Sequence, residues 1–212
     1  MRSNLLPIAK EGFKYIFCAL FLTIVFSILD LGFLEFLSFA TLVFFIFIYR
    51  NPERENILYQ ENSVVSPTDG KVIAIDELKN DSKYAYKITI DNTYLDTSLL
   101  RVPFTGLVSF IRNEKGARVA SKSSLFGKIN ENSEIVFQDT NKNELKVVHT
   151  LKQSVTPLAV DLINNQKLLQ GSRYGVMVNG ITTIYLPQTF RVNLSVGAEV
   201  KASQTLVGYF TH

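Results

Sequence analysis

Two apolar stretches without a single charged residue fill most of the first fifty positions of this 212-residue chain. They are Tyr15–Leu29 (YIFCALFLTIVFSIL) and Phe36–Tyr49 (FLSFATLVFFIFIY), and the short turn between them carries two acids, Asp30 and Glu35. A helix of about 20 apolar residues crosses a bilayer, whereas in water such a helix must be covered by other parts of the protein. We therefore expect the chain to begin with two apolar helices.

The length of the two stretches favours a membrane anchor. Each uncharged run gives about 21–23 Å of helix against a hydrocarbon core of about 30 Å. Phe13 extends the first run and the apolar residues within 31–34 extend the second, which brings both closer to spanning length. Lys14 can reach the interface along its apolar stem. Residues 1–50 are thus predicted to be a two-helix transmembrane hairpin, or a hairpin that dips into the inner leaflet.

The flanking charges predict the orientation of this anchor. Arg2, Lys10 and Lys14 precede the first run, Arg50 and Arg54 follow the second, and the turn between the runs has only acids. By the positive-inside rule, both ends of the hairpin and everything after residue 50 face the cytoplasm. We expect the protein at the plasma (inner) membrane, with its soluble domain on the cytoplasmic side.

Two other interpretations of the apolar stretches fit less well. A buried helical hairpin of a soluble protein would show similar apolar runs. A cleaved signal peptide needs a small-residue cleavage site, which the chain lacks, and a second apolar run follows the first.

Residues 51–212 have the pattern of a β-rich domain. Short segments rich in Val, Ile, Tyr and Thr alternate with turn signals such as Asp69-Gly70 and Asn179-Gly180. No long segment has a helical period, so we predict an antiparallel sandwich or barrel. Its two ends, Ser66–Val72 and Val196–Gly208, resemble the turn pattern of lipoyl-like barrel-sandwich folds. That likeness also allows a function as an adaptor of an export system. However, no lysine stands in a motif that carries a prosthetic group.

Composition excludes several classes of function. A net charge of +3 is too small to argue for a nucleic-acid partner. One cysteine, Cys18, allows no internal disulfide and no thiolate cluster. The two histidines, His149 and His212, are far apart in sequence, so no metal site is expected. His149 lies in a strand-like run and is predicted to be exposed on a strand face.

Six motifs in one order resemble the short-form phosphatidylserine decarboxylase proenzymes. They are Tyr49–Arg54 (YRNPER), Val65–Val72 (VSPTDGKV), Leu95–Gly106 (LDTSLLRVPFTG), Ile129–Asn132 (INEN), Arg173–Met177 (RYGVM) and Ile184–Pro187 (IYLP). The family patterns at these places are F-R-D-P-x-R, V-S-P-A-D-G-x-V, L-N-V-H-V-N-R-x-P-x-x-G, N-E-R, R-F-G-x-I and D-x-Y-L-P. The resemblance covers nearly the whole chain and implies a membrane-bound carboxy-lyase of phospholipid biosynthesis.

The resemblance also implies a cofactor that the chain makes from itself. In the family, a serine after glycine attacks the preceding carbonyl and becomes a pyruvoyl group, which is the electron sink for loss of carbon dioxide. This chain is one residue shorter than the family pattern between Arg173 and Pro187. The reactive serine therefore falls on Ile181 or on Gly180, depending on the landmark, and neither has a nucleophilic side chain. Pyruvoyl formation is not expected here.

Other family-equivalent positions are altered or isolated. Ser98 stands where the family has histidine, and a serine cannot carry protons near neutral pH as imidazole does. Asp69 matches the acid/base partner of the family's serine, but with nothing to activate it is expected to cap a turn. Arg101, Pro103 and Met177 are predicted to line a lipid pocket. The family's catalytic set, which corresponds here to Asp69, Ser98 and Gly180 or Ile181, is therefore not intact.

We interpret the sequence as a non-catalytic, lipid-binding or regulatory homologue of the family, without a cofactor. Its expected partners are membrane phospholipid, and a phospholipid-synthesis enzyme or a second copy of itself. The alternative is an active phosphatidylserine decarboxylase with atypical self-processing, which converts phosphatidylserine to phosphatidylethanolamine and CO2. Ser172 follows a glycine but lies nine residues before Ile181, and Thr182 follows Ile181 rather than a glycine, so each is a poor substitute for the lost serine.

Overall fold

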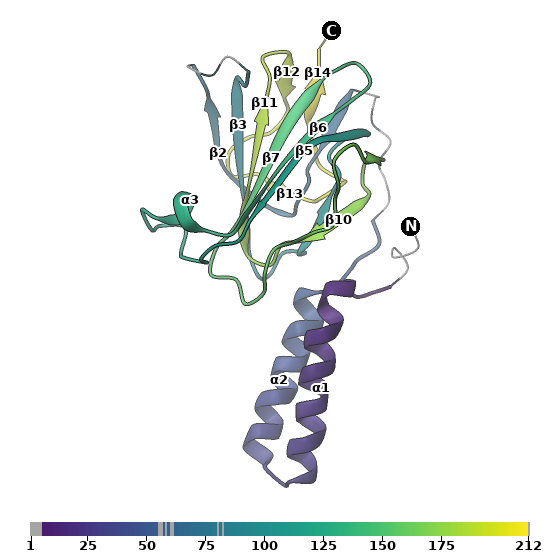
Figure 1. Cartoon of the computed structure of the whole chain (residues 1–212), viewed down its shortest axis with the longest axis vertical. Helices are drawn as coiled ribbons and strands as arrows, with labels where there is room; N and C mark the ends of the chain where they lie inside the picture. The colour runs from purple at the N-terminus through teal and green to yellow at the C-terminus, as the bar shows by residue number, and fades with distance from the viewer. Residues whose placement is uncertain are drawn as a thin grey trace. The chain divides into compact units, whose positions relative to one another are not determined.

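The computed structural model describes residues 6–54, 57, 59, 62–79, 81 and 83–211, and Arg2 and His212 lie outside them. The chain divides into two compact units, Met1–Glu53 and Arg54–His212. The first is helical and the second is built mainly of strands (Figure 1).

Both apolar stretches of the first unit are helical. A short 3-10 helix (Lys10–Gly12) leads into α1 (Phe13–Ile28), and α2 (Gly32–Ile48) follows after a turn. The Tyr15 ring stacks on Phe45 and Tyr49, with centroids 5.3 and 5.8 Å apart. A Cβ on Gly12 would lie 2.4 Å from Cγ of Tyr49, so only glycine allows this close approach.

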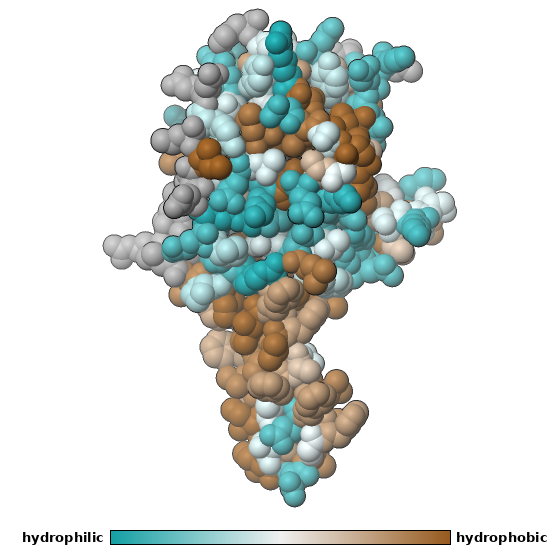
Figure 2. All heavy atoms as spheres, turned by 180° about the vertical axis from the view of Figure 1, so that it is seen from behind, coloured by the Kyte–Doolittle hydropathy of each residue, from teal (hydrophilic) through white to brown (hydrophobic). Residues whose placement is uncertain are grey.

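Apolar side chains remain uncovered on both helices. Ile28 and Phe33 are each 78% exposed, and Figure 2 shows apolar residues over much of this unit. The helical stretch Lys10–Ile28, 19 residues long, is apolar and long enough to cross a membrane, whereas Gly32–Ile48 is shorter. Among the described residues, one helix therefore has the length and composition of a membrane span. The two-helix transmembrane anchor and its orientation stay predictions.

The second unit is mainly antiparallel β-structure, as the sequence predicts. Its elements are β1 (Ser63–Val65), β2 (Gly70–Glu77), β3 (Tyr86–Asn92), β4 (Leu99–Arg101), β5 (Gly106–Glu114), α3 (Phe126–Ile129), β6 (Asn132–Gln138), β7 (Glu144–Leu151), β8 (Ala159–Val160), β9 (Lys167–Leu168), β10 (Arg173–Val176), β11 (Gly180–Leu186), β12 (Phe190–Val192), β13 (Glu199–Val200) and β14 (Leu206–Phe210).

These strands form one large sheet and two small ones. The large sheet has eight strands in the order β13-β2-β3-β11-β7-β6-β5-β9, and the small sheets are β1-β14-β12 and β4-β10-β8. Alternate residues of β7 and β11 are buried, which is the period of a strand with one face on the core. The core between the sheets includes Ile88, Leu100, Phe137, Val147 and Ile184.

Candidate functional site

The fold brings the family-equivalent positions to one end of the large sheet. Gly180, the first residue of β11, pairs with Asn92, the last residue of β3. The Asn92 side chain donates from Nδ2 to the backbone oxygen of Asp69, 2.9 Å away. The backbone N–H of Met177 donates to the oxygen of Ser98 over 2.7 Å. Asp69, Ser98 and Gly180 therefore converge, although they are far apart in sequence.

Asp69 is engaged by an arginine that the sequence analysis did not pair with it. Arg54 donates from its two terminal nitrogens to the two carboxylate oxygens of Asp69, each over 2.5 Å. The amide of Ala202 donates to Oδ1 over 2.8 Å. Both charged side chains are at most 10% exposed. The expected turn cap is therefore wrong: the carboxylate joins three segments, through an ion pair with Arg54 and a hydrogen bond from the Ala202 amide.

The Asn179-Gly180 break is a change of sheet rather than a hairpin turn. The preceding strand, β10, pairs with β4 and β8, whereas β11 pairs with β3 and β7. Asn179 adopts a left-handed conformation with φ of 58°. A Cβ on Gly180 would lie 2.5 Å from Sδ of Met177 and 2.9 Å from the backbone oxygen of Thr150. Close approach, not turn geometry, requires glycine at this position.

Gly180, Ile181 and Ser98 have no acidic or basic side chain. Ile181 is the second residue of β11 and pairs with Asp91 and Thr150. Ser98 is 3% exposed and lies just before β4. Because Gly180 and Ile181 have no hydroxyl, the residues at the break do not fit the self-made pyruvoyl group of the family. Among the described residues, no three His, Cys, Asp or Glu side chains gather as a metal site.

The three residues predicted to line a lipid pocket are buried. Met177 is fully buried and Arg101 is 6% exposed. Arg101 donates from a terminal nitrogen to the Gly171 oxygen over 3.1 Å. Burial, together with nearby Arg173 and Arg54, lowers the pKa of Arg101 to about 10. Pro103 accepts from the Val65 amide over 2.9 Å. The pocket stays a prediction.

His149 is not exposed, contrary to the sequence-based expectation. It is fully buried in β7. Its Nδ1 lies 2.8 Å from Oγ1 of Thr182, and its Nε2 lies 2.6 Å from the hydroxyl of Tyr174. Burial lowers the pKa of His149 to about 3 and raises the pKa of Tyr174. The imidazole is therefore neutral at physiological pH. One of its two hydrogen-bond partners, Thr182, is the residue that follows Ile181.

An open hollow of about 330 Å³ lies elsewhere on the domain. Its lining includes Glu77, Lys83, Tyr84 and Gln188. Glu77 pairs with Tyr86 at the end of the large sheet opposite to Gly180. The hollow is therefore remote from the family-equivalent positions.

Comparisons with known proteins agree with the motifs. The family model described as Phosphatidylserine decarboxylase matches residues 41–208. The phosphatidylserine decarboxylase proenzyme of Desulfotalea psychrophila is 29% identical over 95% of this chain and 96% of its own length. The proenzyme of Geobacter sp. (strain M21) is 31% identical over 98% of this chain and 99% of its own length. The proenzyme of Geotalea daltonii is 29% identical over the full length of both chains.

Proposed function

The chain belongs to the phosphatidylserine decarboxylase family, and we propose that it is a membrane-anchored member that binds aminophospholipid without decarboxylating it. The family places the protein in phospholipid metabolism. The observation that carries the proposal is the Gly180-Ile181 pair, where an alcohol would be needed for attack on the preceding carbonyl. In this role the protein retains lipid or regulates a neighbouring enzyme of lipid synthesis.

The surroundings of Gly180 support the same conclusion. Asp69 has both carboxylate oxygens bound by Arg54, and Oδ1 also accepts from the Ala202 amide. Gly180 and Ile181 offer this carboxylate no alcohol to deprotonate. Ser98 supplies no group that titrates near neutral pH. A nucleophile and a proton carrier would both have to come from elsewhere.

One observation favours the alternative, an active decarboxylase with atypical self-processing. The Thr182 hydroxyl lies 2.8 Å from a ring nitrogen of the neutral His149, which is a hydroxyl–imidazole pair one residue beyond Ile181. Against it, Thr182 is fully buried and lies in β11, paired with Ile90 on one side and with His149 on the other. Attack on the Ile181 carbonyl would require this strand to leave the sheet.

The test uses the purified full chain in detergent. It is incubated with equal amounts of phosphatidylserine, phosphatidylethanolamine and phosphatidylcholine, and native mass spectrometry records which lipids stay bound. A parallel assay measures CO2 released from phosphatidylserine labelled in its carboxyl group. We expect enrichment of the two aminophospholipids and no CO2 above a protein-free control. Release of CO2 supports the alternative, and equal retention of all three lipids contradicts selective binding.

A further inference from the structure

Several loops leave the large sheet at the end where Gly180 lies. In the sheet, Gly180 pairs with Asn92 and Leu151, and Asn132 pairs with Glu114 and Thr150. The connections 93–98, 115–131 and 152–158 therefore start at the same edge. We call this edge the loop end.

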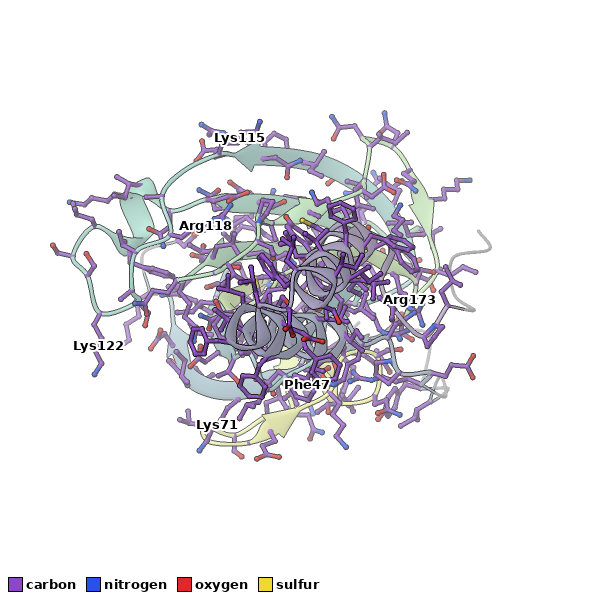
Figure 3. The ribbon with its side chains drawn as sticks, turned by 90° about the horizontal axis from the view of Figure 1, so that it is seen from below. Phe47, Lys71, Lys115, Arg118, Lys122 and Arg173 are labelled. Carbon is purple, nitrogen blue, oxygen red and sulfur yellow. The ribbon has the colours of Figure 1, made fainter. Side chains whose placement is uncertain are left out.

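The longest of these connections is strongly basic. The segment Lys115–Asn130, here called the basic arm, contains Lys115, Arg118, Lys122 and Lys128 and no acidic residue. The three lysines are exposed. Arg118 forms an ion pair with Glu131 at 3.2 Å. Figure 3, which views the chain from below, shows Lys115, Arg118 and Lys122 along one side of this end.

The basic arm has a defined conformation that fixes where its charges lie. The Ala117 amide donates to the Ile129 oxygen over 2.8 Å. Asn130, 3% exposed, donates from Nδ2 to the oxygens of Val119 and Leu151 over 2.9 and 2.6 Å. These bonds close the arm on itself and attach it to the end of β7.

Aliphatic side chains lie exposed among these cations. Leu125 and Ile129 on the basic arm are 48% and 42% exposed, and Val155 on the neighbouring loop is 53% exposed. The two loops are linked, because the Gln153 amide donates to the Arg118 oxygen over 3.0 Å. Cations interleaved with aliphatic residues suit a lipid interface, where the charges meet anionic headgroups and the side chains enter the boundary region.

Nearby acids are already engaged within the protein. Asp91 pairs with Lys152, Glu114 with Arg112, and Glu131 with Arg118. Asp96 accepts from the backbone and hydroxyl of Thr93, each over 2.8 Å. The positive charge of the three exposed lysines is therefore available to an external anionic surface.

We propose that the basic arm docks onto an anionic phospholipid bilayer, with Leu125 and Ile129 at the headgroup boundary. The proposal rests on the membrane attachment in the proposed function, but not on loss of catalysis or on lipid selectivity. Only residues 49–53 link the end of α2 to Arg54, so a bilayer that holds the helices is within reach of the domain. Docking would hold the loop end, with Asp69 and Gly180, next to the lipid surface.

The test places a probe on the basic arm of the full chain. In a Cys18→Ser background, Leu125→Cys carries an environment-sensitive fluorophore, and the protein is reconstituted in nanodiscs of phosphatidylcholine alone or mixed with phosphatidylglycerol. We expect a blue shift in the anionic discs that is lost near 1 M salt, where the Debye length is about 3 Å. Each lysine at an anionic surface should change the docked-to-undocked ratio by roughly five-fold.

Matched variants separate docking from general charge effects. The triple change Lys115→Gln, Lys122→Gln and Lys128→Gln should abolish the shift. The control change Lys79→Gln, Lys142→Gln and Lys167→Gln removes three exposed lysines remote from the loop end and should preserve the shift. Equal spectra in both lipids, or a shift that survives the arm variant, overturn the docking proposal. A chain that does not enter discs refutes the membrane attachment itself, and docking with it.

Discussion

Arg54 and Asp69 form a bidentate ion pair, with both N–O distances at 2.5 Å and both side chains almost completely buried. The pair joins the first residue of the β-rich unit to the turn that precedes β2. It also occupies the carboxylate that corresponds to the family's acid/base group. The same contact therefore stabilises the fold and fixes the position of this carboxylate at the family-equivalent site.

Removing the arginine should destabilise the domain strongly. Arg54→Ala leaves the Asp69 carboxylate buried without its cation, which costs about 3–5 kcal/mol of unfolding free energy. Thermal unfolding of the full chain in detergent measures the loss. The double variant Arg54→Met/Asp69→Asn keeps an acceptor for the Ala202 amide without a buried charge, and should be more stable than Arg54→Ala. If Arg54→Ala melts like the exposed control Arg191→Ala, the pair does not stabilise the domain.

Acid should destabilise the fold through His149. Its folded pKa is about 3 against 6.5 in the unfolded chain, so the unfolded state binds the extra proton between these values. Stability is complete above about pH 6.5 and falls by about 1.4 kcal/mol per pH unit as the pH drops toward 3. Unfolding measured at pH 7 and pH 5 reports the effect.

A His149→Gln variant isolates this contribution from that of the carboxylates. Glutamine can hydrogen-bond to Thr182 and Tyr174 but does not titrate, so its loss of stability between pH 7 and 5 should be smaller by about 2 kcal/mol. Identical pH dependence in both proteins would show that the imidazole is not held neutral by burial.

Gly180 should tolerate no side chain. Gly180→Ala places a methyl group against Met177 and the Thr150 carbonyl, and overpacking of this kind costs about 1–3 kcal/mol. Adding Met177→Ala should recover only part of the loss, because the backbone oxygen cannot retreat. The control is Gly127→Ala, since a Cβ there meets nothing within 4 Å. A Gly180→Ala protein as stable as Gly127→Ala would contradict this packing.

Restoring the alcohol alone should not restore self-cleavage. In Ile181→Ser the hydroxyl returns, but Ser98 still replaces the imidazole and the chain is still one residue shorter than the family pattern between Arg173 and Pro187. We expect an uncut chain on a denaturing gel, equal to an Ile181→Ala control. A new C-terminal fragment in the serine variant alone would mean that the nucleophile is the sole missing group.

The sequence predicted the family and the mainly antiparallel β-structure, because these depend on local motifs and on a period of two. The same period of two places His149 on the buried face of its strand. Leu145, Val147, His149 and Leu151 are buried and alternate with half-buried residues in β7.

Long-range pairing could not be read in the same way. The Asn179-Gly180 dipeptide is a local hairpin signal, yet the strands before and after it find partners in different sheets. Likewise, Arg54 and Asp69 stood in two recognised motifs, but nothing local links a cation to a carboxylate fifteen positions later. Only the folded arrangement brings these groups into contact.

The most direct test of the central claim is the intact mass of the purified wild-type protein. We predict one species with the mass of the uncut 212-residue chain. Cleavage within residues 180–182 would contradict the account, if it gives two fragments of which the second carries a carbonyl in place of its amino terminus.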